Sequence, residues 1–247
     1  GWLAGVSVAL LHAGGTELYG FGKVGTGGAA PTADTVFELG SITKVFTSVV
    51  LAERVRRGQV RLDQPVAELL PPGATVPSRD GKVITLEHLA THTSGLPRLP
   101  VGFAPKDVTD PYADFDEARL LASLEVAVLD TPPGARYAYS NLGAGLLGYA
   151  LARQAGKTYE DLVRELVTAP LGLRDTAITL TPAQQARFAQ GHDPDGRPVP
   201  AWRIPILAGA GALRGTARDL ARFLWANLGQ LGPGLGPALT ETHRLRH

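Results

Sequence analysis

The 247-residue sequence contains no cysteine and has almost no excess charge of either sign. The lack of cysteine excludes disulfide scaffolds, cysteine-ligated metals and thiol catalysis. With 24 Lys and Arg against 23 Asp and Glu, the net charge is +1. So small a charge gives no electrostatic basis for binding nucleic acid or an anionic membrane surface, and we expect neither as a partner.

Methionine and long apolar runs are absent as well. No apolar stretch approaches the roughly 18 residues that a membrane-spanning helix needs, so no membrane segment is expected. Because even position 1 lacks methionine, we expect the sequence to begin after the native start codon, and it assigns neither a signal peptide nor a localisation. What is present, 44% apolar and 19% charged residues, is typical of a globular protein with a substantial core.

The first part of the sequence predicts a β-hairpin followed by a long helix. Residues 6–11 and 17–24 are strand-like and flank a turn. Apolar residues at helical spacing predict a helix over residues 42–57, and Gly58 stands where a left-handed C-cap is favoured.

The rest of the sequence is mostly helical in pattern. Helices are expected over residues 116–129 and 142–155, with loops at 71–81 and 94–111, which are rich in Pro, Gly and Asp. Threonine caps followed three positions later by Asp or Gln predict three more helix starts, at Thr158, Thr181 and Thr216.

This order of elements predicts an α/β (α+β) fold, an antiparallel sheet with flanking helices plus a mostly helical inserted subdomain. We expect residues 1–45 and 206–247 to form the sheet side, and residues 46–205 the helical subdomain. Two strands cannot cover the apolar faces of so many helices, and the last residues are not strand-like. We therefore expect C-terminal sheet strands to be missing and a sheet edge beside residues 5–24 to be unpaired, which would leave residues 1–247 weakly active and prone to associate.

One serine, Ser41, is followed three positions later by a lysine, Lys44. Ser41 lies where an extended segment meets the long predicted helix, so unpaired backbone N–H groups and the positive end of the helix dipole favour an oxyanion there. Lys44 lies one turn on, with its Cβ roughly 5–6 Å from that of Ser41. A buried, neutral lysine at this place accepts the serine proton. The alternative is an ordinary helix start, with serine as the N-cap and lysine in solvent.

A second pattern, Tyr139 followed by Asn141, precedes the helix expected at residues 142–155. A phenol beside an ammonium group is pushed toward phenolate, so Tyr139 is a candidate base or proton shuttle for Ser41. Asn141 offers both a donor and an acceptor to a substrate amide. The alternative is that Asn141 is an N-cap and that Tyr139 is a buried aromatic residue whose hydroxyl alone reaches water.

Taken together, these segments resemble the penicillin-recognising serine hydrolases, which include class C β-lactamases, D-Ala-D-Ala peptidases and related esterases. The resemblance covers nearly the whole chain in the right order. Five segments carry it: FELGSITKVFT (37–47), LEHLATHTSGLP (86–97), PGARYAYSN (133–141), PLGLRDT (170–176) and AGAGALRGTARDLARF (208–223).

The resemblance implies a serine hydrolase that acts on a β-lactam, an ester or a peptide through a covalent ester at Ser41. Lys44 and Tyr139 would move the proton, and Asn141 would bind the substrate; no cofactor and no metal are implied. The family's third motif, Lys-Thr-Gly or His-x-Gly, is not identifiable, because the matches at 12–14 and 23–25 precede the nucleophile. The alternative is therefore a catalytically silent relative that binds a peptide or a protein partner. The oligomeric state stays open.

Two histidines four residues apart, His88 and His92, have the spacing of a zinc site on one helix face. Position 89 is not glutamate, so the metalloprotease motif fails, and no third ligand is evident. We expect the two imidazoles instead to cap and hydrogen-bond the turn at residues 93–95.

Overall fold

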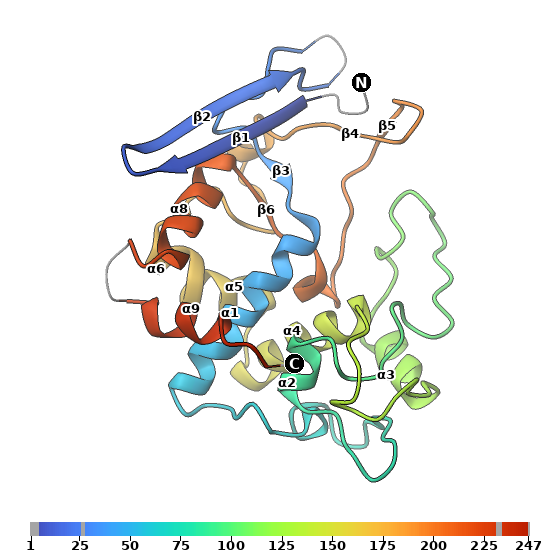
Figure 1. Ribbon diagram of the computed structural model, residues 1–247. Helices are drawn as coiled ribbons and strands as arrows, with labels where there is room; N and C mark the ends of the chain where they lie inside the picture. The colour runs from blue at the N-terminus through green and yellow to red at the C-terminus, as the bar shows by residue number, and fades with distance from the viewer. Residues whose placement is uncertain (1–4, 26–27, 231–233, 247) are drawn as a thin grey trace.

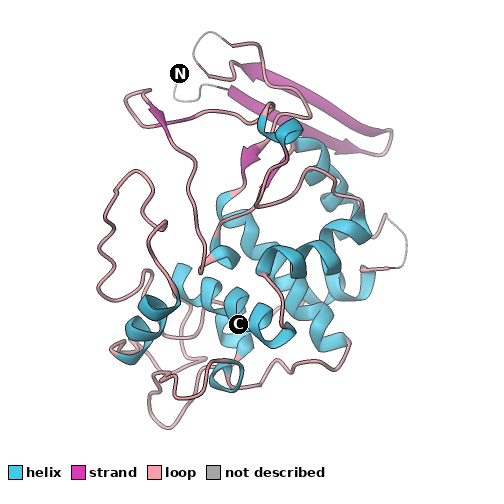
Figure 2. Cartoon of the chain, turned by 180° about the vertical axis from the view of Figure 1, so that it is seen from behind, coloured by secondary structure: helices cyan, strands magenta, loops and turns pink. Residues whose placement is uncertain are grey.

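The computed structural model describes residues 5–25, 28–230 and 234–246. A β-hairpin lies across one end of a helical body (Figure 1), and long loops run along one side of it, as Figure 2 shows from behind. The strands are β1 (Gly5–His12), β2 (Gly15–Gly22), β3 (Phe37–Glu38), β4 (Gly191–His192), β5 (Pro198–Val199) and β6 (Arg214–Gly215). The α-helices are α1 (Thr43–Arg56), α2 (Leu86–Ala90), α3 (Glu117–Glu125), α4 (Asn141–Ala155), α5 (Tyr159–Val163), α6 (Ala169–Leu171), α7 (Pro182–Gln185), α8 (Ala217–Asn227) and α9 (Gly236–Thr242).

Tighter or wider helical turns connect these elements: the 3₁₀ turns η1 (Gly40–Ile42), η2 (Val66–Leu69) and η4 (Ala208–Ala210), and the π-helical turn η3 (Arg164–Thr168). No helix among the described ranges is long and apolar enough to cross a membrane. The predicted mixed α/β fold is confirmed, and the expected threonine caps of α5, α7 and α8 are all formed.

The strands form three separate two-stranded antiparallel sheets within the described residues. In the first, β1 pairs with β2, and Val8 lies opposite Tyr19. The inner face of this hairpin packs on α8, while its outer face leaves Val8, Leu10, Tyr19 and Phe21 exposed. The structure therefore shows only part of an antiparallel sheet, as the sequence predicts. In the second sheet, β3 pairs with β6 across 176 positions of sequence, which brings the segment before α1 beside the segment before α8.

The helix expected over residues 116–129 is α3, and it ends four residues early, at Glu125. Beyond it the exposure of the side chains alternates: Val126 and Val128 are exposed, whereas Ala127 and Leu129 are buried. This period of two is that of an extended chain, and the Asp130 amide donates to the Gly95 carbonyl at 3.0 Å. Tertiary packing thus overrides the helical pattern at the end of this segment.

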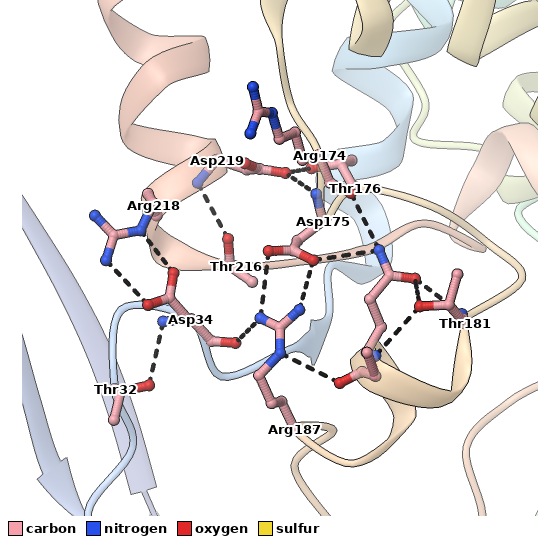
Figure 3. Close-up of polar contacts among 12 residues, drawn as sticks. Thr32, Asp34, Arg174, Asp175, Thr176, Thr181, Arg187, Thr216, Arg218 and Asp219 are labelled. Atoms are coloured by element: carbon pink, nitrogen blue, oxygen red, sulfur yellow. Dashed lines mark hydrogen bonds and ion pairs between the residues drawn. The ribbon is translucent and has the colours of Figure 1, made fainter.

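An ion-pair network fixes the segment that leads into β3 (Figure 3). Asp34 accepts two hydrogen bonds from Arg218 at the start of α8, at 2.6 and 3.0 Å. Arg187 donates to the Asp34 carbonyl at 2.6 Å and also pairs with Asp175. The amide of Asp175 in turn donates to Asp219 on α8 at 2.8 Å. Side chains from three distant segments thereby hold the strand that precedes Ser41.

Glycines on α4 allow η4 to approach this helix closely. A Cβ at Gly148 would lie 2.8 Å from the Cα of Gly209, and a Cβ at Gly145 would lie 2.5 Å from the Leu207 side chain. Such distances are shorter than real Cβ contacts, so only glycine fits here unless the backbone shifts. The close approach fixes η4, whose Ala210 carbonyl belongs to the site described below.

Replacing Gly148 with alanine is expected to lower the free energy of unfolding by about 1–3 kcal/mol, because the new methyl group overpacks against backbone. Urea denaturation measures this loss. The matched control is Gly143→Ala on the same helix, where the nearest atom to a new Cβ is the Ser140 hydroxyl oxygen at 3.3 Å. Equal stability of the two variants would contradict the close helix approach.

Candidate active site

Ser41 lies in η1, directly between β3 and α1. The Leu39 amide donates to the Leu213 carbonyl at 2.9 Å, and the Leu213 amide donates to the Thr43 hydroxyl at 3.1 Å. These bonds fix the backbone on both sides of Ser41. Residue 42 is the N-cap of α1, and no side chain caps this helix, so the exposed Ser41 hydroxyl has no capping role.

The Lys44 amine lies one helical turn from Ser41 and points back at it. Its Nζ donates to the Ser41 Oγ at 3.0 Å and to the Ala210 carbonyl of η4 at 2.6 Å. Burial lowers the pKa of Lys44, and the positive charge of Arg98 adds to this effect, while Tyr139 opposes it. The structure thus provides the two conditions that favour a neutral amine, burial and a positive neighbour.

The Tyr139 phenol, from a distant part of the chain, contacts the same serine oxygen. Its hydroxyl donates to the Ser41 Oγ at 2.7 Å, and the Lys44 Nζ lies 4.9 Å from the centre of its ring. Burial raises the pKa of Tyr139, but hydrogen bonds with Lys44 and Ser41 and the charges of Lys44 and Arg98 outweigh it, so the pKa is lowered overall. The serine oxygen therefore lies between an amine and a phenol, each with a lowered pKa.

His92 holds the short segment that carries Tyr139. The backbone of His92 is left-handed, with φ of 58°. Its carbonyl accepts from the Ala138 amide at 2.7 Å, and its Nδ1 accepts from the Ser140 amide at 3.1 Å. The imidazole also lies against the Tyr139 ring, with 4.6 Å between ring centres. Burial and the charge of Lys44 lower the pKa of His92 to about 4, so the ring is neutral near pH 7 and Nδ1 accepts.

The expectation that both histidines cap the turn at residues 93–95 differs from what the structure shows. The His88 side chain closes a capping box with Thr85 at the start of its own helix, α2. His92 binds the tyrosine segment instead. Within the described part of the chain, no group of three or more side chains is placed to hold a metal ion.

Asn141 is the first residue of α4, and the N-cap is its neighbour Ser140, whose hydroxyl accepts from the Gly143 amide at 2.8 Å. The alternative of Asn141 as an N-cap is therefore wrong. The side chain of Asn141 is half-buried and takes no part in capping. Burial raises the pKa of Tyr112, and a hydrogen bond with Asn141 partly offsets that rise. Its backbone amide donates to the Arg98 carbonyl at 2.9 Å.

Three parts of this site were not identified from the sequence: the Ala210 carbonyl, the tyrosine contacts of His92, and Arg98, whose guanidinium carbon lies 5.1 Å from the centre of the Tyr139 ring. All three depend on contacts between distant segments. The available signal was that His92 and Ala210 belong to the segments 86–97 and 208–223, which carry part of the family resemblance, and that Arg98 directly follows the first of these segments.

The chain is similar to known proteins over most of its length. The family model described as Beta-lactamase matches residues 1–246. The D-alanyl-D-alanine-carboxypeptidase/endopeptidase AmpH of Escherichia coli K12 is 37% identical over 198 residues, which is 78% of this chain and 49% of that protein. The crystal structure of a β-lactamase/D-alanine carboxypeptidase from Yersinia pestis has a TM-score of 0.80 at 31% identity, covering 92% of this chain and 63% of that one.

A class C β-lactamase from Rhodobacter sphaeroides has a TM-score of 0.81 at 30% identity, covering 97% of this chain and 66% of its own. The chain thus spans about half the length of AmpH and about two thirds of these solved structures. The match of the family model to almost every residue, together with these relatives, shows that the chain belongs to the β-lactamase family.

Proposed function

We propose that this chain carries the nucleophile and the proton-transfer groups of a serine hydrolase that forms a covalent ester at Ser41. One observation carries the proposal: the Ser41 Oγ lies within hydrogen-bond distance of both the Lys44 amine and the Tyr139 phenol. The relatives named above are β-lactamases and D-alanine carboxypeptidases, so the substrates we propose are β-lactams and peptides, with esters as a further class.

In the proposed reaction, the Ser41 oxygen attacks the carbonyl carbon of the substrate, and its proton passes to Lys44 or Tyr139. The C–N or C–O bond to the leaving group then breaks as the same pair returns that proton to the leaving atom. Water attacks the acyl carbon of the ester at Ser41 and loses a proton to the pair. The bond from that carbon to the Ser41 oxygen then breaks, the pair returns the proton to this oxygen, and the acid is released. The backbone amide of Ser41 donates to the oxyanion that forms in both steps.

The proposal also covers where the substrate binds. The amide side chain of Asn141, two residues after Tyr139, would hydrogen-bond the substrate amide. Ser41 comes from the part we assign to the sheet side (1–45 and 206–247), and Tyr139 from the helical part (46–205). We infer that the substrate binds along the boundary between these two parts, where ligand sites are common.

The competing proposal is that the chain is a catalytically silent relative that binds a peptide or a protein partner. A fluorescent penicillin and a fluorophosphonate probe separate the two, since only the hydrolase becomes labelled, at Ser41. Assays with nitrocefin, a p-nitrophenyl ester and a D-Ala-D-Ala peptide then rank the substrate classes. No label and no turnover with any of them would favour the silent relative.

A related prediction concerns His92. Replacing it with alanine removes the acceptor for the Ser140 amide and the ring that packs against Tyr139. Because the Tyr139 hydroxyl is then no longer held at the Ser41 oxygen, kcat should fall by about 10- to 100-fold. His92→Asn keeps a side-chain acceptor and tolerates the left-handed backbone, so it should recover part of this loss. Steady-state kinetics on a p-nitrophenyl ester measure both. Equal rates in the two variants would argue against positioning by His92.

A further inference from the structure

Thr47 is a buried residue of α1, one helical turn beyond Lys44, and the reaction proposed above gives it no part. Its hydroxyl donates to the Gly209 carbonyl of η4 at 2.8 Å. Lys44 donates to the next carbonyl, that of Ala210, at 2.6 Å. Two side chains three residues apart on one face of α1 therefore hold two successive carbonyls of η4. The bond from Thr47 fixes the backbone from which the Ala210 carbonyl projects.

Tyr159, the first residue of α5, contacts Thr47 from 112 positions further along the chain. The two hydroxyl oxygens lie 2.6 Å apart. Burial raises the pKa of Tyr159, so the phenol keeps its proton. The single hydroxyl hydrogen of Thr47 has the Gly209 carbonyl as its nearer acceptor, since the Thr43 carbonyl lies at 3.2 Å. Tyr159 is therefore the donor in the pair, and its bond holds the Thr47 hydroxyl toward η4.

The orientation of the Lys44 amine decides whether it accepts the Ser41 proton. A neutral amine has two hydrogens and one lone pair, and proton transfer needs the lone pair directed at the serine hydroxyl. One N–H directed at the Ala210 carbonyl leaves the lone pair able to face the Ser41 Oγ, 3.0 Å from Nζ. If the Ala210 carbonyl moved, the amine would lose this orientation.

The Ala210 carbonyl is the neighbour of the amine that a change at Thr47 reaches. The titratable or charged side chains that face Lys44 are Tyr139, Arg98 and His92, and these come from other segments than η4. An acceptor stabilises the ammonium form of a lysine. Loss of the Ala210 acceptor would therefore lower the pKa of Lys44 further, in addition to turning the amine.

We propose that Thr47 and Tyr159 are positioning residues, which fix η4 so that the Ala210 carbonyl orients the Lys44 amine toward Ser41. Neither residue touches the substrate or the reacting atoms. The proposal rests on the hydrolase function proposed above and adds to it the contacts that orient its base. Both residues act through Lys44 and not through the substrate, so their effect is the same for lactams, esters and peptides.

The first test is Thr47→Val, which keeps the shape of the side chain and removes the hydroxyl. On p-nitrophenyl acetate, kcat should fall by about 10- to 30-fold and KM should change by less than about 3-fold, because a misdirected amine slows proton transfer and not binding. The rise of the rate with pH should move to lower pH, since the ammonium form loses an acceptor. Thr47→Ser keeps the hydroxyl, so its kcat should stay within about 3-fold of wild type and its pH profile should not move.

A second test, Tyr159→Phe, keeps the buried ring and removes only the donor to Thr47. Its kcat should fall by about 2- to 5-fold. Combined with Thr47→Val it should cost nothing more, because the valine has already removed the acceptor for this hydroxyl. Losses that multiply in the double variant would show that Tyr159 does not act through Thr47. This variant keeps the proposal testable if Thr47→Val folds poorly.

The matched control is Thr168→Val, the same replacement at a threonine of η3 that is 3% exposed, against 1% for Thr47. In the described part of the chain, the side chains that hydrogen-bond η4 are those of Lys44 and Thr47, so this control should keep the wild-type rate and pH profile.

NMR of ¹³C-labelled lysine, with Lys44→Met to assign the signal, measures the pKa of Lys44 directly, and Thr47→Val should lower it. If kcat falls in Thr47→Val but neither the pH profile nor this pKa moves, the role of Thr47 is merely structural and the positioning proposal is wrong, although the hydrolase function stands. If wild type hydrolyses none of the substrates, the hydrolase function falls, and the positioning role that rests on it falls as well.

Discussion

Replacing Ser41 with alanine is expected to abolish covalent labelling by a fluorescent penicillin or a fluorophosphonate and to lower kcat by more than about 10⁴-fold. Any activity that remains would come from binding and oxyanion stabilisation without a covalent intermediate. The folded state should be almost unaffected, because no side chain caps α1 and the hydroxyl is exposed. Its free energy of unfolding should change by less than about 1 kcal/mol.

The matched control is Ser48→Ala, a serine on α1, the helix that follows Ser41; this variant should be labelled, and should hydrolyse substrate, like wild type. Mass spectrometry of the intact labelled protein counts the adducts, and peptide mapping places them. Undiminished turnover of every ester, lactam and peptide by Ser41→Ala, or a label that persists in it, would remove Ser41 as the nucleophile.

The sequence predicts the Ser41–Lys44 pair because a helix places residues three apart on one face, and this geometry is local. The 3.0 Å contact in the structure needs only the helical turn that runs from η1 into α1. Tyr139 is different, since 98 positions separate it from Ser41, and no periodicity joins two such residues. Only the resemblance to a family placed them together.

His92 and Arg98 show where sequence reasoning ends. The left-handed backbone of His92 and its bonds to residues 138 and 140 exist only once the two loops meet. The same holds for β3 and β6, which are two residues each and pair across most of the chain. Segments so short carry no alternating pattern, so the long-range pairing that fixes the approach to Ser41 is visible only in the structure.

Lys44 and Tyr139 are expected to behave as one catalytic unit. Lys44→Met should lower kcat by about 10³-fold, and Tyr139→Phe by a similar factor, because each change breaks the same proton path from the Ser41 oxygen. The phenylalanine keeps the ring that lies against His92, so this variant tests the hydroxyl alone. The double variant should be scarcely worse than either single one, since residues that share one path are strongly non-additive.

The pH dependence separates the two groups further. A lysine accepts a proton only when neutral, so the wild-type rate should rise with pH through the pKa of Lys44. Burial lowers that pKa, which brings the rise closer to neutral pH than an exposed lysine would allow. This limb should vanish in Lys44→Met but persist in the control Lys106→Met, which changes an exposed loop residue. If the losses of the single variants simply multiply in the double variant, Lys44 and Tyr139 perform separate tasks, and the shared proton path is wrong.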